Sequence, residues 1–289
     1  MGLSFNYRRK MIKPDKLRFG TSGIPLSTNP HDTINGINQV RNLNLDAMEL
    51  EFVRSINVSK EKAPLVKETA KKNDILLTAH SSYYINLNSK DKKIWHASIS
   101  RIVQSAKITY LCNGYSVCFH PAYYMKDNPE DAYNKVKEAL NLVLKELKKD
   151  DVKIWIRPET AGKISQFGNI NEVINLSLEF ENVLPCIDFS HLHSYSNGKY
   201  NTKEEFREVL TLMEKKLGKT ALNNVHFHCQ GINYSEKGER NHINLKESDM
   251  NYKDLVKVWK EFKVKGIVVC ESPNVEKDAI LLKEAYNKV

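Results

Sequence analysis

The stretch Ile75-Leu76-Leu77-Thr78-Ala79-His80 carries the pattern that decides the fold. It is a short, mostly apolar run that ends in a histidine. A strand buried on both faces has this character, because neither face meets water. Seven further runs of this kind occur: Leu17–Gly20, Ala47–Phe52, Tyr115–His120, Val152–Glu159, Val183–Asp188, Val225–Cys229 and Gly266–Glu271. We therefore expect eight buried strands.

Segments of helical character separate these runs. The clearest are Pro129–Lys149, Asn169–Glu181, Thr202–Leu217, Tyr252–Phe262 and Asn274–Ala285. Alternating strands and helices are typical of parallel βαβ units. Eight units favour a closed barrel, because open sheets more often have about five to seven strands. The sequence predicts an α/β fold with a single (β/α)8 TIM barrel over residues 17–289, preceded by a basic, loosely ordered arm over residues 1–16.

The composition is that of a soluble globular protein, with 41% hydrophobic and 27% charged residues. No apolar run approaches the roughly 18 residues that cross a bilayer. The basic N-terminal residues lack the apolar stretch of a signal peptide. We therefore expect a cytoplasmic protein with no membrane partner.

The formal net charge is +9, from 44 Lys and Arg against 35 Asp and Glu. A basic protein suits a polyanionic partner such as nucleic acid. Lysine-rich solvated helix faces explain the same charge equally well. Both interpretations stay open on charge alone.

Five cysteines are present, an odd number, and none of them forms a C-x-x-C pair. Four of the five lie inside strongly apolar segments. This pattern favours buried free thiols in a reducing compartment over a disulfide framework or a thiolate zinc site.

Most of the predicted strands end in, or carry, a side chain that binds metals. These residues are His80, His120, Glu159, Asp188, Glu271 and, within the seventh run, His226 and His228. Any one of them alone is usually a solvated loop residue. The carboxyl ends of barrel strands all meet at one mouth, however, so six strands bring ligand-type residues to one cavity. Clustered buried carboxylates are costly without a cation, which predicts a metal cluster there.

Two predicted loops add further candidates. His191 follows the sixth strand, and Glu239 and His242 follow the seventh, so these three would form a more exposed metal position. We expect His193 and His228 to have hydrogen-bonding or packing roles.

Glu49 and Glu51 share one face of the second strand, since side chains alternate with period two. They would either support the mouth or pair with lysines, and the sequence does not choose between these roles.

Several short motifs together resemble endonuclease IV, the barrel-fold apurinic/apyrimidinic endonuclease family. They are residues 79–87 (AHSSYYINL), 119–121 (FHP), 159–162 (ETAG), 186–191 (CIDFSH) and 271–274 (ESPN). The resemblance runs from about Arg18 to the end of the chain and rests on the order and spacing of these motifs. It implies a hydrolase that flips out an abasic nucleotide and cleaves the phosphodiester on its 5′ side. The implied partner is damaged double-stranded DNA, and we expect the protein to act as a monomer.

The resemblance also implies a ligand set for two or three zinc ions, although mixed His and carboxylate ligands also accept Mn²⁺ or Fe²⁺. The first ion would take His80, His120 and Glu159, and Glu159 would bridge to a second ion completed by Asp188, His226 and Glu271. His191 would belong to a third ion. The family's Asp-x-His partners of that ion are matched here by Glu239-x-x-His242, or by Glu239-x-Asn241 if the register is strict. The family's strand-seven motif continues from its His to Asn-Asp, whereas residues 226–231 read HFHCQG.

Catalytic and DNA-binding roles follow from the same resemblance. Glu159 would fix the spacing of the ions, and Glu271 would orient or deprotonate the attacking water. Tyr83 and Tyr84 would enter the DNA helix beside the flipped nucleotide, and Arg54 corresponds to an arginine that follows the second strand.

Two other functions remain open. A single-metal sugar isomerase or epimerase, resembling the xylose isomerase class, would use Glu159, Asp188, His226 and Glu271 and would not need His80, His120 or His191. A metal-dependent DNA-binding barrel that has lost cleavage is the second alternative, suggested by the changes at the third position.

Overall fold

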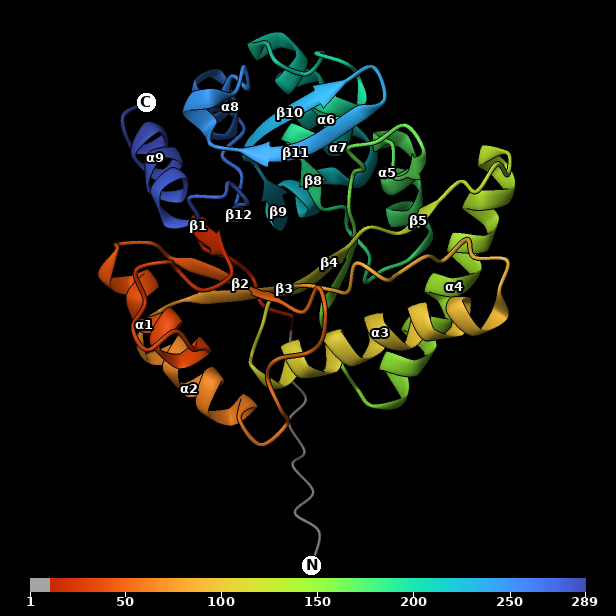
Figure 1. Ribbon diagram of the computed structural model, residues 1–289, viewed down its shortest axis with the longest axis horizontal. Coiled ribbons are helices and arrows are strands. Elements are labelled where there is room, and N and C mark those ends of the chain that lie inside the picture. Colours follow the sequence, from red (N-terminus) through yellow and green to blue (C-terminus); the bar gives the residue numbers. More distant parts are fainter. Residues whose placement is uncertain (1–10) are drawn as a thin grey trace, which may run out of the picture.

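The computed structural model describes residues 11–289 and confirms the α/β TIM barrel (Figure 1). Eight parallel strands follow the order β6-β4-β3-β2-β1-β12-β9-β8. Two parallel bridges, Ile156 to Val183 and Glu159 to Cys186, join the edge strands β6 and β8 and close the barrel. The barrel strands are β1 (Leu17–Ser22), β2 (Ala47–Glu51), β3 (Leu76–His80), β4 (Ser116–Phe119), β6 (Trp155–Pro158), β8 (Ile187–Asp188), β9 (Val225–His228) and β12 (Gly266–Cys270).

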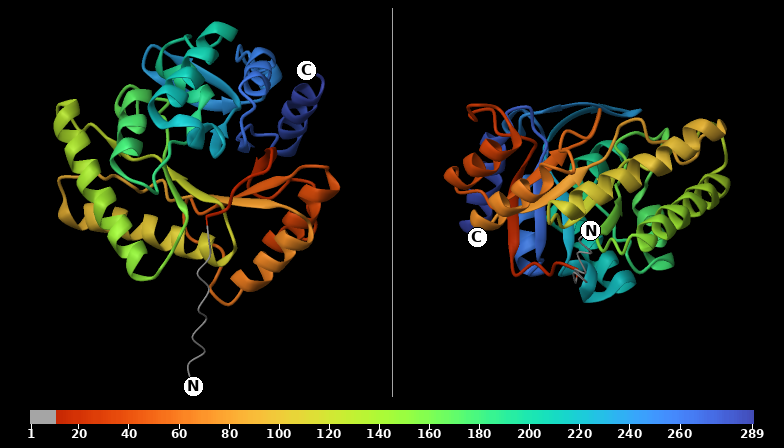
Figure 2. Two further views of the ribbon diagram at one scale, coloured as in Figure 1. Left: turned by 180° about the vertical axis from the view of Figure 1, so that it is seen from behind. Right: turned by 90° about the horizontal axis from the view of Figure 1, so that it is seen from below.

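Helices cover the outside of the barrel, as both views of Figure 2 show. They are α1 (Thr33–Asn42), α2 (Ala63–Lys72), α3 (Lys92–Leu111), α4 (Pro129–Lys149), α5 (Ile170–Glu179), α6 (Phe189–Tyr195), α7 (Lys203–Leu222), α8 (Tyr252–Glu261) and α9 (Glu276–Asn287), with a 3-10 turn η1 (Leu245–Glu247). None of the helices within residues 11–289 is long and apolar enough to cross a membrane.

Helix starts follow the local sequence. Asn128 caps α4 by accepting from the backbone N–H of Asp131, and Pro129 occupies the first turn, where its missing N–H costs nothing. Reciprocal capping boxes begin α5 at Asn169 and α7 at Thr202. These caps determine the residue at which each helix begins after the loop that follows a strand.

Two segments that we predicted to be loops are regular structure. His191 lies in helix α6, because the Asp188 carboxylate caps that helix by accepting from the His191 backbone N–H. Glu239 and His242 lie in an antiparallel hairpin, formed by β10 (Gly231–Ser235) and β11 (Gly238–Ile243), which packs on α6. A second small pair, β5 (Ala122–Tyr123) and β7 (Gln166–Phe167), joins the loops after β4 and β6.

The predicted N-terminal arm lies partly outside the described residues, which exclude residues 1–10. In the described part, Met11 and Ile12 are half-buried against the core, and the Lys16 ammonium lies 3.8 Å from the Asp46 carboxylate.

All five cysteines are buried free thiols, as the sequence predicts. Three of them, Cys112, Cys229 and Cys270, pack within the hydrophobic core cluster, whereas Cys118 and Cys186 lie outside it.

The barrel interior is polar, whereas branched apolar residues usually fill it. The Glu49 carboxylate of β2 accepts from Thr78 (2.8 Å) and lies 3.1 Å from the His226 ring of β9. Because β1 and β12 separate β2 from β9 in the sheet, this contact crosses the inside of the barrel. The polar interior continues to the mouth, where the candidate site lies.

Candidate metal centre

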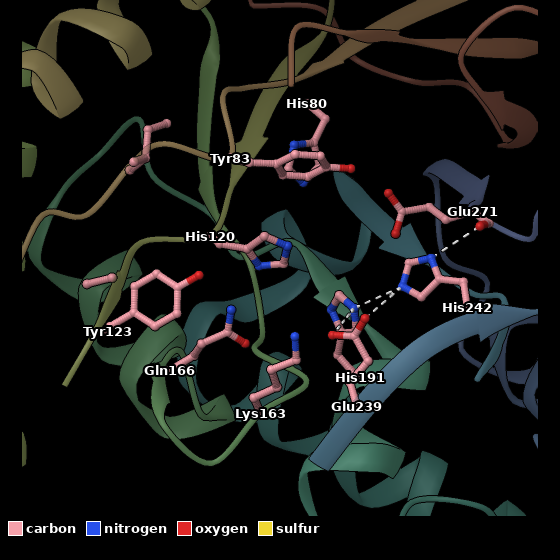
Figure 3. A pocket seen from close by; sticks show the side chains of 12 residues that line it. His80, Tyr83, His120, Tyr123, Lys163, Gln166, His191, Glu239, His242 and Glu271 are labelled. Carbon is pink, nitrogen blue, oxygen red and sulfur yellow. Dashed lines mark hydrogen bonds and ion pairs between the residues drawn. The ribbon is translucent and has the colours of Figure 1, made fainter. Parts of the chain in front are cut away.

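A cavity of about 230 Å³ opens at the carboxyl ends of the strands. Figure 3 shows four imidazole rings, those of His80, His120, His191 and His242, around this cavity. Glu239 and Glu271 complete its polar wall. The structure thus brings together side chains from strands β3, β4 and β12, helix α6 and strand β11.

The first ligand group consists of His80, His120 and Glu159. The Glu159 Oε2 atom lies 3.1 Å from His80 Nε2 and 3.7 Å from His120 Nδ1. The other ring nitrogen of His80 lies 2.8 Å from the Ser81 carbonyl oxygen. Because a carbonyl only accepts, His80 Nδ1 carries a hydrogen. Its Nε2 faces Glu159, so an ion between the two side chains would take Nε2 as its ligand atom.

The second group consists of Glu159, Asp188, His191 and Glu271. Asp188 is held in place from two sides: its Oδ1 accepts from the His191 backbone N–H (2.8 Å) and its Oδ2 from Gln230 Nε2 (2.7 Å). His191 Nδ1 lies 3.0 Å from Asp188 Oδ2 and 3.3 Å from Glu159 Oε1. Three carboxylates therefore converge beside one imidazole.

The third group consists of His191, His242 and Glu271, with Glu239 close by. The Nε2 atoms of His191 and His242 are 3.4 Å apart, and Glu239 lies 3.8 Å from the first and 3.6 Å from the second. His242 Nδ1 faces the Glu271 carbonyl oxygen at 3.2 Å, which leaves its Nε2 free to bind an ion.

A close backbone approach carries Glu239 to this position. The Glu239 N–H donates to the Gly162 carbonyl (2.8 Å), and Lys163 pairs with Gly238. A Cβ atom on Gly162 would lie 2.8 Å from the His191 ring and 2.9 Å from Glu239 Oε2. Glycine at this position therefore leaves room for the third group.

The two histidines of β9 lie at different depths, and His228 is the one beside the mouth carboxylates. His228, predicted to pack or form hydrogen bonds, points its Nδ1 at the mouth, 3.2 Å from Glu159 Oε1 and 3.5 Å from Glu271 Oε2. His226, predicted as the metal ligand beside Asp188 and Glu271, lies deeper and contacts Glu49 and Ser116. Both side chains face inward by period two, but His228 is two residues nearer the carboxyl end.

Electrostatics at the mouth push the pKa values of neighbouring groups apart. Burial alone would lower the pKa of His80, but the hydrogen bond and charge of Glu159 raise it to about 10. Burial lowers the pKa of His120 to about 4. Burial would raise the pKa of Glu271, but the charge and hydrogen bond of His228 lower it to about 2. Such perturbed groups in a cavity are typical of functional sites.

The donor set fits a cation better than a set of ordinary hydrogen bonds. The buried Nδ1 atom of His120 has no hydrogen-bond partner among residues 11–289. Glu159 is fully buried, yet histidine nitrogens of four residues surround its two oxygens at 3.1–3.7 Å. Imidazole nitrogens gathered around one buried carboxylate are the ligand chemistry of zinc.

The predicted DNA-contacting residues lie at the rim. Tyr83 and Tyr84 are 59% and 62% exposed, and Tyr83 packs edge-on against the His80 ring. The Arg101 guanidinium lies over the Tyr84 ring. Arg54 is exposed in the loop after β2 and does not line the cavity.

The remaining predicted residues have other surroundings. His193 hydrogen-bonds the Lys199 carbonyl and the Asp249 carboxylate. Glu49 is fully buried, and Glu51 accepts from the Ser22 hydroxyl (2.8 Å). Neither glutamate forms an ion pair with a lysine among residues 11–289; Glu49 instead lies 3.1 Å from His226 and 3.2 Å from His228.

Sequence reasoning missed Gln230, Lys163 and Gln166. Gln230 holds Asp188, and the other two line the cavity. Period two from His226 through His228 to Gln230 was the available signal for the first. Lys163 pairs with Gly238, and Gln166 of β7 pairs with Tyr123, so tertiary pairing brings both to the cavity and no sequence signal pointed to them.

Comparison with known proteins places the chain among related barrels. The model of the xylose isomerase-like TIM barrel family matches residues 37–287. An uncharacterised protein of Methanocaldococcus jannaschii is 42% identical, over 94% of this chain and 98% of its own length. A probable endonuclease 4 of Halothermothrix orenii is 25% identical, over 65% of this chain and 73% of its own length.

Solved structures of two activities share the fold. Endonuclease IV from Thermus thermophilus aligns with a TM-score of 0.72 at 17% identity, covering 94% of this chain and 98% of its own. A D-tagatose 3-epimerase-like protein aligns with a TM-score of 0.70 at 16% identity, covering 93% of this chain and 96% of its own. At these identities the likeness concerns the fold alone. The chain belongs to the xylose isomerase-like TIM barrel family.

Proposed function

We propose that this protein is a metal-dependent hydrolase that cleaves the phosphodiester 5′ to abasic sites in double-stranded DNA, in the manner of endonuclease IV. The observation that carries the proposal is the position of Glu159. One of its oxygens faces His80 and His120, and the other faces His191 and His228. A carboxylate with nitrogen donors on both sides suits two ions that share it, the arrangement of two-metal phosphodiesterases.

The contacts suggest three ligand sets. They are His80, His120 and Glu159; Glu159, Asp188, His228 and Glu271; and His191, Glu239 and His242. Zinc fits these sets, and Mn²⁺ or Fe²⁺ would also accept them. Bound divalent ions supply Lewis acidity, which activates water at neutral pH and offsets the charge of a phosphate.

The chain's own residues supply positioning and proton transfer. Glu271 lines the cavity, whereas the Glu159 and Asp188 side chains are fully buried. The low pKa of Glu271 keeps its carboxylate ionised, so it is able to orient a water and accept its proton. The Lys163 ammonium at the cavity wall would attract the phosphate.

The rim supports DNA as the substrate. Tyr83 and Tyr84 are large, exposed rings beside the cavity, and aromatic side chains fill the gap that a flipped nucleotide leaves. An abasic site is already unstacked, which lowers the cost of flipping. The sequence similarity to probable endonucleases 4 agrees with this choice.

A single-metal sugar epimerase is the second candidate, and one observation favours it. Glu159, Asp188 and Glu271 lie around His228 Nδ1 and by themselves form a complete one-metal set. That reaction would leave His80 and His120 without a role. Their joint position at Glu159 therefore favours the hydrolase.

The first test is nicking of a labelled duplex with one abasic site, by full-length protein whose metal content is measured in the same preparation. We expect cleavage 5′ to the lesion, lost with a chelator and restored by zinc, with two or three ions per chain. No cleavage with one ion per chain would favour the epimerase, and ketose epimerisation would be assayed next. Tight binding of the duplex without cleavage, in fully loaded protein, would indicate the non-cleaving DNA-binding barrel.

A His120→Asn variant separates the two enzymes. We expect nicking to fall by roughly 100-fold or more, because metal ions supply several kcal/mol of charge stabilisation. Epimerisation would be unaffected by the same change. The matched control is His96→Asn on the exposed side of α3, which leaves the mouth intact. Equal nicking by both variants would contradict the hydrolase.

A further inference from the structure

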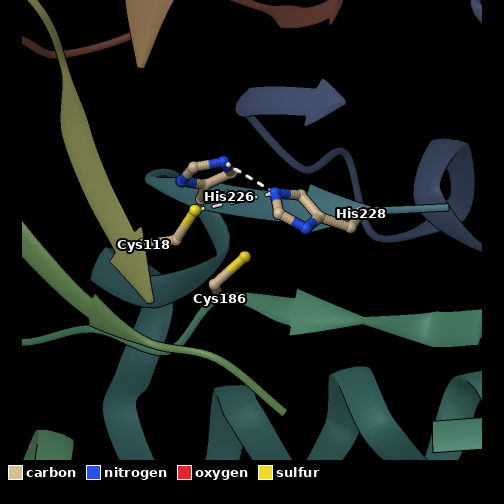
Figure 4. A group of neighbouring side chains, drawn as sticks. All are labelled: Cys118, Cys186, His226 and His228. Atoms are coloured by element: carbon tan, nitrogen blue, oxygen red, sulfur yellow. Dashed lines mark hydrogen bonds between the residues drawn. The ribbon is translucent and has the colours of Figure 1, made fainter. Parts of the chain in front are cut away.

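A second group of ligand-type side chains lies inside the barrel, beneath the mouth. Cys118 of β4, Cys186 before β8, and His226 and His228 of β9 bring their sulfur and nitrogen atoms within 4.8 Å of one another. Figure 4 shows the two thiols facing the two imidazoles across the barrel interior. All four residues have no exposed surface. We call Cys118, Cys186, His226 and the neighbouring Glu49 the inner layer.

The separations match a tetrahedral ion. The Nε2 atoms of His226 and His228 are 3.2 Å apart, and Cys118 Sγ lies 3.8 Å from His228 Nε2. Ligand atoms on a tetrahedron with Zn–N and Zn–S bonds of about 2.0–2.3 Å are roughly 3.3–3.8 Å apart. The same two Nε2 atoms lie 3.1 and 3.2 Å from the Glu49 oxygens, so a cation here would take the place of the protons that join them to Glu49.

The histidines are already oriented for binding. His226 Nδ1 is held by the Ser116 hydroxyl at 3.0 Å, which leaves Nε2 pointing to the barrel axis. His228 points Nδ1 at the mouth carboxylates and Nε2 at the inner layer. It therefore connects the two regions through one ring.

The two thiols differ from the other three cysteines. Cys112, Cys229 and Cys270 pack in the hydrophobic core, whereas Cys118 contacts Glu49 (3.4 Å) and His228. Cys186 has no exposed surface and lies, with Cys118, within 4.8 Å of the ring nitrogens of His226 and His228. A buried thiol in polar surroundings suits a metal ligand better than a packing residue.

A disulfide does not explain the pair. Strand β6 lies between the strands that carry Cys118 and Cys186, since Cys118 pairs with Arg157 and Cys186 with Glu159. Two strand spacings amount to about 9–10 Å, whereas the Cα atoms of a disulfide are roughly 4.4–6.8 Å apart.

Charge also supports a cation at this position. The Arg157 guanidinium is 1% exposed and donates to the Pro185 and Asn224 carbonyls and to the Tyr115 hydroxyl. It forms no ion pair within residues 11–289. One divalent cation with Arg157 would balance two thiolates and Glu49, which leaves the buried set neutral.

We propose that Cys118, Cys186, His226 and the Nε2 atom of His228 form a structural site for a borderline-soft divalent cation such as zinc, separate from the mouth ions. On binding, the two thiols release their protons to solvent. Where a mouth ion also takes His228 Nδ1, the His228 ring releases its N–H proton too and faces an ion on each side. Since the site has no exposed surface, the ion enters as the chain folds and leaves only when the barrel opens. The site does not depend on the proposed hydrolase activity, and its test uses no activity readout.

The first experiment is zinc X-ray absorption on full-length wild-type protein folded with zinc. We expect sulfur scatterers at about 2.3 Å together with nitrogen and oxygen scatterers from the mouth. Nitrogen and oxygen scatterers alone, in protein with a full complement of zinc, would overturn the proposal. This measurement needs no variant and is unaffected by any folding defect.

Cobalt substitution then assigns the ligands. Protein folded with Co²⁺ should show a thiolate-to-cobalt charge-transfer band, which Cys118→Ser and Cys186→Ser weaken or abolish together with loss of about one ion per chain. The matched control Cys270→Ser, a buried strand thiol in the apolar core, should keep the band, and so should the mouth variant Glu159→Gln. A band that Glu159→Gln removes while Cys118→Ser and Cys186→Ser keep it would contradict the inner site.

Discussion

The mouth and the inner layer are built from the same strands, two residues apart, yet their chemistry differs. Strand β9 gives His228 to the mouth and His226 to the inner layer, and the chain around β8 gives Asp188 and Cys186. The mouth holds four carboxylates, Glu159, Asp188, Glu239 and Glu271, at an open cavity. The inner layer holds two thiols and a single carboxylate, all without exposed surface. Because inward-facing side chains recur every second residue along a strand, ligand groups lie one above another along the barrel axis. The open end of the barrel carries carboxylates, which are hard ligands, whereas the enclosed interior carries thiols, which are soft ligands.

Replacing one glutamate by glutamine in each region should give the largest difference in nicking rate. Glu159→Gln should lower the nicking rate by roughly 1,000-fold or more, because it removes the carboxylate that both ion groups share. Glu49→Gln should lower the rate by less than about 10-fold, because Glu49 lies below the mouth and acts through His228. Rates are measured on duplex with one abasic site, with metal content determined for each variant. Equal losses would show that the two regions form one functional unit.

The two histidines of β9 sharpen the comparison. His228→Asn should weaken binding of the mouth ions and lower nicking by roughly 100-fold, since its Nδ1 faces Glu159 and Glu271. His226→Asn should remove the inner ion and leave the mouth ions bound. Metal stoichiometry and nicking measured on both variants check this. If His226→Asn lost the mouth ions and His228→Asn kept them, our assignment of His228 to the mouth and His226 to the inner layer would be wrong.

A chelator should remove metal ions from the mouth and from the inner layer at different rates. A chelator should remove the mouth ions from folded protein quickly and lower the free energy of unfolding by about 2.7 kcal/mol for each ion held at hundredfold excess over its dissociation constant. Each such loss corresponds to a fall in Tm of about 4–5 °C. The inner ion should stay until the protein unfolds, because no cavity reaches it. The measurement is metal release as a function of time, together with thermal melts. Release of all ions in a single phase would contradict an enclosed inner site.

The rim aromatics should give the smallest effect. Tyr83→Ala and Tyr84→Ala should each weaken binding of abasic duplex by about 1–3 kcal/mol, or roughly 5- to 150-fold, through lost stacking. Metal content should not change, because neither ring belongs to a ligand group. Titration of fluorescent abasic and intact duplexes measures the effect. Normal binding by both variants would remove the tyrosines from DNA recognition.

Much of the mouth was predictable because parallel strands impose a common direction. Once eight buried strands alternate with helices, the residues that end them must share one mouth, which is how His80, His120, Glu159, Asp188 and Glu271 come together. The positions of the strand ends along the sequence are sufficient for this inference. No knowledge of register or side-chain packing is needed.

Height within the barrel was not predictable from the same pattern. Period two places His226 and His228 on one face but does not say which of them reaches the cavity. The register of β9 against β8 and β12 decides that, since Asp188 lies beside His228. The same register brings Cys118 and Cys186 to the level of His226, although the sequence indicated only buried thiols.

The sequence by itself determined the barrel and the ligand types at its strand ends, because burial pattern and strand direction are local properties of the chain. The tertiary structure alone decided which residues meet across the barrel. Contacts such as Glu49 with His226, or Glu239 with His191, join segments whose approach depends on barrel closure and on the hairpin docked at Gly162. Closure is a property of all eight strands together, so no single stretch encodes it.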